Sequence, residues 1–337
     1  MRKAFSLAVL AFTTTLFAQD QSATVTQACS AVQSLAIPDG DSTASCKYPA
    51  NLYYGTDGKP DYSAARRCAL TQWHQIKRPL DGVTDETIIM PIATLTMVYA
   101  NGDGVPRNVD LAIRIICVDD PPSNSWGPLD QLVAALLRTK DVPQRFDFCT
   151  SGIDFWKRVD YECLGIQQKL DENKRMLPLS SRMSTWTPAQ RAAYSRMMTS
   201  YESFVREERE AEATGGTGVG GQMMEAEHDL RVELIDDTIR FDTGHLPRFT
   251  HQDYSDADKT LNLTYTKLLS DLEAKKAENF CKSPEMIRDI ERVWVPYRDD
   301  WVEFARLRWP QVETVSWLTY LTRKRTKQLT NVSECML

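Results

Sequence analysis

Apolar residues recur three and four positions apart along most of this chain, and this spacing restricts the fold more than any other feature. The strongest case lies near the C-terminus, in a stripe made of Ile287, Ile290, Trp294, Tyr297, Trp301 and Phe304. Such spacing places the side chains on one face of an α-helix, whereas half-buried strands need an alternation of two. We therefore predict an all-α fold in which amphipathic helices bury their apolar faces against one another.

The length of the chain favours more than one compact unit. It has 337 residues, and single hydrophobic cores stop growing near ~250 to 300 residues. We predict a signal peptide over 1–18, a helical domain over 19–175, a helical hairpin over 187–245 and a helical bundle over 246–337. The formal net charge of -6 argues against a nucleic-acid partner, because duplex binding needs a clustered excess of Lys and Arg.

The N-terminus has the pattern of a secretory signal. Arg2 and Lys3 precede an uncharged run from Ala4 to Ala18, which is shorter than the ~20 residues of a membrane-spanning helix. No Cys follows this run closely, so we expect no stable membrane anchor. The mature chain, beginning near Gln19, is expected to be exported to the periplasm.

The cysteines predict disulfide bonds. All eight lie beyond the signal, at Cys29, Cys46, Cys68, Cys117, Cys149, Cys163, Cys281 and Cys335. An even number in an exported chain favours disulfides over metal ligation, and no zinc-ligand spacing is present, so we expect no metal. The hypothesis that each bond stays within one structural unit gives Cys29–Cys46, Cys68–Cys117, Cys149–Cys163 and Cys281–Cys335.

Two segments of the N-terminal half look like an internal repeat. The sequence YYGTDGKP at 53–60 is echoed by YANGDGVP at 99–106, about 46 residues later, and each is followed by a small Ala. Short helices separated by Pro and Gly are predicted over 62–77, 85–100, 109–117, 129–138 and 147–174. The stretch over 50–120 resembles the Sel1-like repeat, a relative of the tetratricopeptide hairpin, and this resemblance implies helical hairpins that bind protein.

A helical hairpin is predicted in the middle of the chain. Thr187 and Gln190 form a capping box around Pro188, and a helix follows to about Ala213. A second helix is predicted over 222–242. The glycines between them fit G-x-G-x-x-G, but an acidic helix precedes the motif and no strand does, so we exclude a dinucleotide site and predict a flexible connection.

The last 90 residues carry three motifs in order. These are ADKTLNLTY at 257–265, WVPYRD at 294–299, and LTRKR at 321–325 followed by Leu329. They resemble the LprI-type lysozyme-inhibitor family over about 246–332. A capping box at Ser255–Asp258 is predicted to open the first of three helices, Pro296 interrupts the second, and the third is expected over 313–329.

We expect most of these motif residues to be structural. They are Asp258, Leu261, Asn262, Tyr265, Trp294, Tyr297, Arg298, Asp299 and Arg325. Aromatic and Leu positions at helical spacing are usually core, so Leu261, Tyr265, Trp294 and Tyr297 are predicted to be buried. Arg298 is predicted to pair with Asp258 or Asp299, and Asn262 to cap a helix or bridge two helices.

The family resemblance implies a protein partner, with lysozyme as the specific candidate. Residues 246–337 hold 15 basic and 14 acidic side chains, whereas residues 202–245 hold 4 and 12. Because lysozyme is basic, the acidic hairpin is the predicted electrostatic contact. Its candidate residues are Glu207, Glu208, Glu210, Glu212, Glu225 and Glu227.

The sequence offers no catalytic or cofactor signature. The four histidines, His74, His228, His245 and His251, occur singly and without metal-ligand spacing, and no nucleophile elbow is present. We therefore predict a non-enzymatic binding protein that inhibits lysozyme. The alternative is a periplasmic scaffold that binds another protein through its Sel1-like repeats, and the sequence leaves the oligomeric state open.

Overall fold

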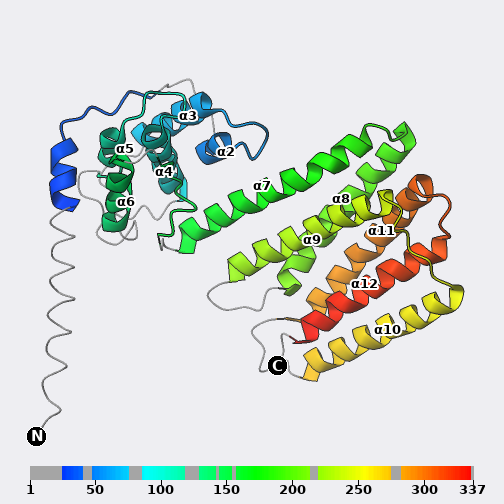
Figure 1. Ribbon diagram of the computed structural model, residues 1–337. Helices are drawn as coiled ribbons and strands as arrows, with labels where there is room; N and C mark the ends of the chain where they lie inside the picture. Colours follow the sequence, from blue (N-terminus) through cyan, green and yellow to red (C-terminus); the bar gives the residue numbers. More distant parts are fainter. Residues whose placement is uncertain are drawn as a thin grey trace, which may run out of the picture. The chain divides into compact units, whose positions relative to one another are not determined.

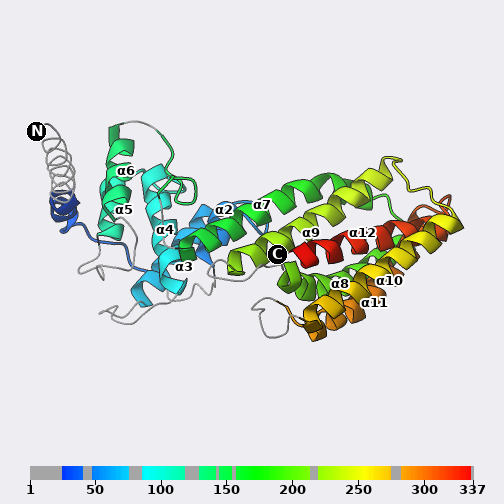
Figure 2. The ribbon, with the colours of Figure 1, turned by 90° about the horizontal axis from the view of Figure 1, so that it is seen from below.

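The computed structural model is all-α, as predicted (Figures 1 and 2). It describes residues 25–40, 48–75, 86–117, 129–141, 144–153, 157–212, 219–274 and 282–334, and no strand occurs among them. The predicted signal peptide lies outside these residues. The chain divides into two compact units, Met1–Leu170 and Asp171–Leu337, so the boundary falls inside one helix, α7 (Lys157–Met183), close to the predicted position 175.

Unit 1 is a succession of short helices. Residues 25–32 are helical, and the later helices are α2 (Pro49–Tyr54), α3 (Tyr62–Gln75), α4 (Glu86–Asn101), α5 (Val109–Ile116), α6 (Leu129–Asp141) and the first part of α7. Consecutive helices pack on one another, α3 on α4, α4 on α5 and α5 on α6. Helix α4 lies at the centre, because almost every described side chain from Met90 to Ala100 is buried.

The two predicted repeats have the same backbone geometry. In each, the first helix ends at a glycine with positive φ, Gly55 at 72° and Gly102 at 76°. The amides of that glycine and of the next residue both donate to one carbonyl, that of Asn51 in the first copy and Val98 in the second. This is the glycine-terminated helix end that a non-glycine residue adopts only with strain.

The same correspondence continues into the following helices. The side chains of Asp61 and Asn108 accept hydrogen bonds from the amides of Ala64 and Leu111, both at 2.9 Å. All four pairs of equivalent positions are separated by 47 residues, one more than the sequence alignment of the two copies indicated. The internal repeat is therefore a repeat of structure as well as of sequence.

The disulfides correct part of the predicted pairing. Cys149–Cys163 is present, as predicted, but Cys29 is bonded to Cys117, so the predicted Cys29–Cys46 and Cys68–Cys117 bonds are wrong. Cys68 is also disulfide-bonded. The error arose because nearest-neighbour pairing ignores that the helix over 25–32 packs beside the end of α5. The Cys29–Cys117 and Cys149–Cys163 bonds both lie within unit 1; the predicted Cys281–Cys335 bond lies outside the described residues.

Unit 2 is a bundle of long helices. Besides the end of α7 it contains α8 (Pro188–Glu212), α9 (Val219–Asp242), α10 (His251–Ala274), α11 (Pro284–Arg308) and α12 (Thr314–Glu334). Helix α8 packs along α11, α10 packs along α12, and α9 packs on α8 (Figures 1 and 2). The predicted capping box opens α8: the Thr187 amide donates to Gln190 at 2.9 Å, and the Gln190 amide donates to the Thr187 hydroxyl at 3.2 Å.

The hairpin and the C-terminal helices share one hydrophobic core. Tyr297 of α11 stacks on Phe204 of α8 with ring centroids 5.4 Å apart, and Phe304 contacts both Trp186 and Tyr194. This corrects the prediction that 246–337 forms a bundle by itself. Helix α8 covers the apolar stripe of α11 and buries its own Met and aromatic side chains in the same core.

Three predicted helices also need corrected boundaries. The predicted helix over 147–174 begins only at Lys157, because residues 144–153 are not helical, and it extends to Met183. Helix α10 starts at His251, and its capping box is formed by Thr250 and Asp253 rather than by Ser255 and Asp258. Helix α9 begins at Val219, within the predicted glycine connection.

Candidate functional site

The apolar residues of the three C-terminal motifs are in the core of unit 2. Leu261, Trp294 and Tyr297 are buried, and Tyr265 is half-buried at the edge. Burial raises the pKa of the Tyr297 hydroxyl well above its ordinary value, so this side chain stays neutral. None of the three buried side chains is available to a partner.

The polar motif residues form contacts within single helices. The Arg298 guanidinium donates to Asp299 at 2.7 Å, the Asp299 carboxylate being 59% exposed, and Arg298 also lies over the Trp294 ring. Asn262 donates to the backbone oxygen and the carboxylate of Asp258, one turn earlier in α10. Neither pair joins two helices, because Asn262 and Asp258 both belong to α10, and Arg298 and Asp299 both belong to α11.

Arg325 is the motif residue that joins several helices. Its guanidinium is fully buried and donates to Glu208 of α8 and to Glu291 of α11, both at 2.7 Å. Burial opposes its charge, but the two carboxylates outweigh this effect and raise the pKa of Arg325. The side chain is therefore an internal cation that links α12 to α8 and α11.

This ion pair corrects one predicted contact residue. The Glu208 side chain is 0% exposed, so it cannot belong to an acidic surface. Glu227 is also engaged, since it pairs with Arg209 of α8 and with Arg231 of α9, and Arg231 reaches Glu202. These pairs fix the antiparallel hairpin and neutralise part of its predicted acidity. The Glu212 side chain lies outside the described residues.

Four carboxylates of the hairpin remain without an ion pair in the described part of the chain. They are Glu207 and Glu210 in the last turns of α8, and Glu225 and Asp229 in the first turns of α9. We call these four the acidic end of unit 2. Three of them are exposed and Glu207 is half-buried, while the same turns also carry the exposed Arg206 and the half-buried Arg209, which pairs with Glu227.

An open groove of about 600 Å³ lies in unit 2 where α9 connects to α10 and α11 to α12. Leu246, Pro247 and Val312 form its apolar walls, and Arg248 and Glu313 bring opposite charges. The connection is anchored by Ser316, whose hydroxyl binds both the amide and the carbonyl of Phe249. With charges of both signs, the groove does not favour an acidic or a basic partner.

Unit 1 holds a polar cluster between the two repeats. Tyr53 of α2 donates to Asp103 at 2.6 Å, and Arg145 donates to both oxygens of the same carboxylate at 2.9 and 2.8 Å. Asn101 donates to the Tyr53 hydroxyl at 2.9 Å. Burial, with the hydrogen bond to Asp103, raises the pKa of Tyr53 well above its ordinary value, so the phenol remains a donor.

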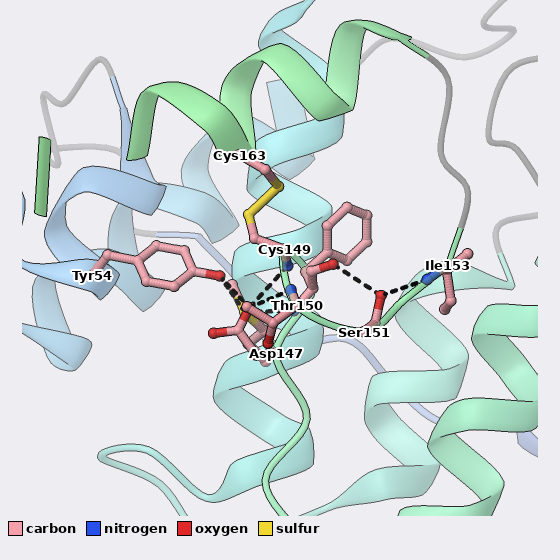
Figure 3. The surroundings of a disulfide bond; sticks show 9 residues. Tyr54, Asp147, Cys149, Thr150, Ser151, Ile153 and Cys163 are labelled. Carbon is pink, nitrogen blue, oxygen red and sulfur yellow. Dashed lines mark hydrogen bonds between the residues drawn. A yellow bond between two sulfur atoms is a disulfide. The ribbon is translucent and has the colours of Figure 1, made fainter. Parts of the chain in front are cut away.

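A neighbouring set of contacts surrounds the Cys149–Cys163 disulfide (Figure 3). The Tyr54 hydroxyl points toward Asp147 and donates to it at 3.0 Å. The same Asp147 oxygen accepts from the amides of Cys149 and Thr150, which closes the turn that leads to the disulfide. The Asp147 carboxylate is thus bound by the Tyr54 hydroxyl and by two backbone amides.

The segment over 144–153, which contributes Arg145 and Asp147 to these contacts, was not expected from the sequence, and its residues from 147 onward were predicted to be helical. Its residues Arg145, Phe146, Asp147 and Phe148 alternate charged and aromatic side chains, a period of two that is typical of extended backbone. That short signal could have excluded a helix here.

Other site types find no support among the residues that the structure describes. No group of three or more His, Cys, Asp or Glu side chains is placed to hold a metal ion there. No described helix is long and apolar enough to cross a membrane. Comparisons with family models, with curated proteins and with solved structures find no match.

Proposed function

We propose that this chain is an exported protein of the cell envelope that acts by binding another protein, with lysozyme as the target. The observation that carries the proposal is the acidic end, formed by Glu207, Glu210, Glu225 and Asp229. The three LprI-like motifs of the same unit support it, and the disulfides of unit 1 support an oxidising compartment.

Ion pairs within the bundle balance the charge of some carboxylates of the hairpin and leave others unpaired among the described residues. Glu202, Glu208 and Glu227 are matched by arginines of the same bundle, so they exert little attraction on a distant partner. The four carboxylates of the acidic end have no ion pair among the described residues, so their negative charge still attracts a basic partner. A basic protein approaching it is steered at low ionic strength, and salt screens the attraction over a Debye length of about 8 Å at physiological concentration.

The test is an inhibition assay with the signal-free, oxidised protein. Lysozyme activity on a cell-wall suspension is measured with rising amounts of the protein, and binding is titrated by calorimetry at low and moderate salt. A variant with Glu207→Gln, Glu210→Gln, Glu225→Gln and Asp229→Asn is expected to bind about tenfold more weakly at low salt, because steering and local attraction are lost.

A matched control removes the same charge elsewhere on unit 2. Asp256→Asn, Asp289→Asn, Asp299→Asn and Glu303→Gln change four carboxylates of α10 and α11 that already have hydrogen-bonding or basic neighbours. This variant should inhibit nearly as well as the unaltered protein. Equal loss in both variants would mean that net charge alone matters, and no inhibition at either salt concentration would refute the proposal.

The alternative function is a scaffold that binds a different envelope protein through unit 1. The observation that favours it is the repeated turn geometry around Gly55 and Gly102, with a polar cluster between the copies. Failure to bind lysozyme, together with capture of a partner that requires unit 1, would favour this alternative.

A further inference from the structure

The open groove of unit 2 is preformed, because hydrogen bonds hold both of its walls. One wall is the connection from α9 to α10, where the Ser316 hydroxyl donates to the carbonyl of Phe249 at 3.1 Å and accepts from its amide at 2.9 Å. The other wall is the connection from α11 to α12, where the Val312 amide donates to the carbonyl of Trp309 at 3.0 Å. Trp309 is buried, and its indole donates to Asp242 at 3.1 Å. A ligand therefore meets a surface that it does not have to order.

The size and lining of the groove are those of a ligand site. Its volume of about 600 Å³ lies within the range of about 300 to 1,000 Å³ that is typical of small-molecule pockets. Leu246, Pro247 and Val312 supply apolar contact area, and the Gln311 side chain can both donate and accept hydrogen bonds. Apolar walls with a few polar groups are the usual composition of such sites.

Two charged side chains of the groove have no partner. Arg248 and Glu313 are exposed, and neither side chain makes a hydrogen bond or ion pair with the described residues, including each other. Nearby charges are paired, since Arg323 contacts Asp253 at 3.1 Å. Arg248 belongs to one wall and Glu313 to the other. Helix α10 begins at His251 beside Arg248, and the partial positive charge of a helix N-terminus adds to that of the guanidinium. The groove thus has one positive and one negative wall.

We propose that this groove binds a short peptide with free ends, with the peptide carboxylate at Arg248 and the peptide ammonium at Glu313. A guanidinium pairs with a carboxylate through two parallel hydrogen bonds, and the apolar walls accept the peptide side chains. A ligand of one charge would leave the opposite wall unmatched.

The groove is distinct from the acidic end. Glu225 and Asp229 lie in the first turns of α9, whereas the groove begins beyond the last residue of that helix, Asp242. The proposal therefore does not depend on lysozyme binding.

The test is a calorimetric titration of the full-length, signal-free, oxidised protein at low salt. The probe is the tripeptide Leu-Ala-Leu with free ends, and saturable binding at millimolar concentration or below is expected. The same peptide with an amidated carboxyl end, and the same peptide with an acetylated amino end, should each bind at least about tenfold more weakly. Each blocked form loses one contact between opposite charges.

Two substitutions assign each end of the peptide to one wall. Arg248→Gln should weaken binding of the free peptide by about tenfold and remove its advantage over the amidated form. Glu313→Gln should likewise remove the advantage over the acetylated form. Because both side chains are exposed and unpaired among the described residues, these variants should fold, and circular dichroism checks this.

Matched controls remove one exposed charge of each sign elsewhere on unit 2. Arg196→Gln in α8 and Glu225→Gln in the acidic end should change the affinity less than about threefold. Three results would each overturn the proposal: no saturable binding of the free peptide, equal binding of the free and blocked peptides, or groove substitutions with no more effect than the controls. Displacement of the peptide by an equal concentration of acetate would also overturn it, because the groove would then be a site for simple anions.

Discussion

Replacement of Arg325 by Met tests whether the buried ion pairs hold unit 2 together. The substitution keeps most of the side-chain volume but removes the charge, which leaves Glu208 with 0% exposure and no cationic partner. Glu291, at 19% exposure, keeps some access to water. Breaking a buried pair by removing one partner costs about 3 to 5 kcal/mol, most of it the cost of the remaining buried charge.

The double variant Arg325→Met with Glu208→Gln separates this cost from loss of packing. It removes both charges of the fully buried pair, and replacing a whole pair in this way is often close to neutral. We expect it to recover more than half of the stability lost in Arg325→Met. A surface control is Arg323→Met, whose side chain is 49% exposed and whose partner Asp253 is 37% exposed, and it should cost less than about 1 kcal/mol.

The assay is urea unfolding followed by circular dichroism, with the free energy of unfolding of unit 2 compared among the variants. The unfolding of unit 1 must be measured separately, because a chain of two units has no single free energy of unfolding. A loss below about 1 kcal/mol in Arg325→Met would refute the reasoning, because a buried carboxylate cannot be left unpaired so cheaply. A double variant as unstable as the single one would show that packing, not charge, determines the effect.

Two further predictions concern a turn and the pH dependence of stability. Gly55→Ala should destabilise unit 1 by about 1 to 3 kcal/mol more than Gly152→Ala. Both glycines have φ near +70°, but a Cβ on Gly55 would lie 2.6 Å from the Pro60 nitrogen, whereas a Cβ on Gly152 would have none of the described atoms within 4 Å. Thermal melting of the two variants measures the difference. Burial opposes ionisation of Glu227, but hydrogen bonds from Arg231 and Arg209 lower the pKa of its carboxyl, so its contribution is present above the ordinary pKa of 4.5 and is lost as the pH falls through the lowered value. Urea midpoints measured from about pH 3 to about pH 7 should fall at the acid end, and Glu227→Gln should flatten that fall; an unchanged profile would contradict the assignment.

The helices could be predicted closely because their signals are local. The periodic apolar positions of α8 and α11, the Thr187 capping box and the glycine turns are each contained within a few neighbouring residues. Such signals act through backbone geometry and side-chain spacing, which the sequence states directly. The repeat was found in the same way, since both copies carry Gly, Asp and Pro at equivalent turns.

The candidate sites were harder to predict because they join distant residues. Glu208 and Arg325 are 117 positions apart, and Asn101 and Phe146 are 45 apart. An acidic run on α8 looked like a surface until the structure placed Glu208 inward, one residue from the half-buried Glu207. The residue spacing gave the helical face of Glu208, but only packing against α11 and α12 showed that this face is internal.

By itself the sequence determined the all-α class, the extent of most helices and the repeated turns, because these follow from spacing, caps and glycine conformation. Only the tertiary structure decided that α8 completes the core of the C-terminal helices, that Cys29 is bonded to Cys117, and that residues 145–149 lie across α2 and α4. The physical reason is that burial and charge pairing depend on which helices meet in space. The residues next to a position in the sequence do not determine which helices pack together, because packing depends on how whole apolar faces fit one another.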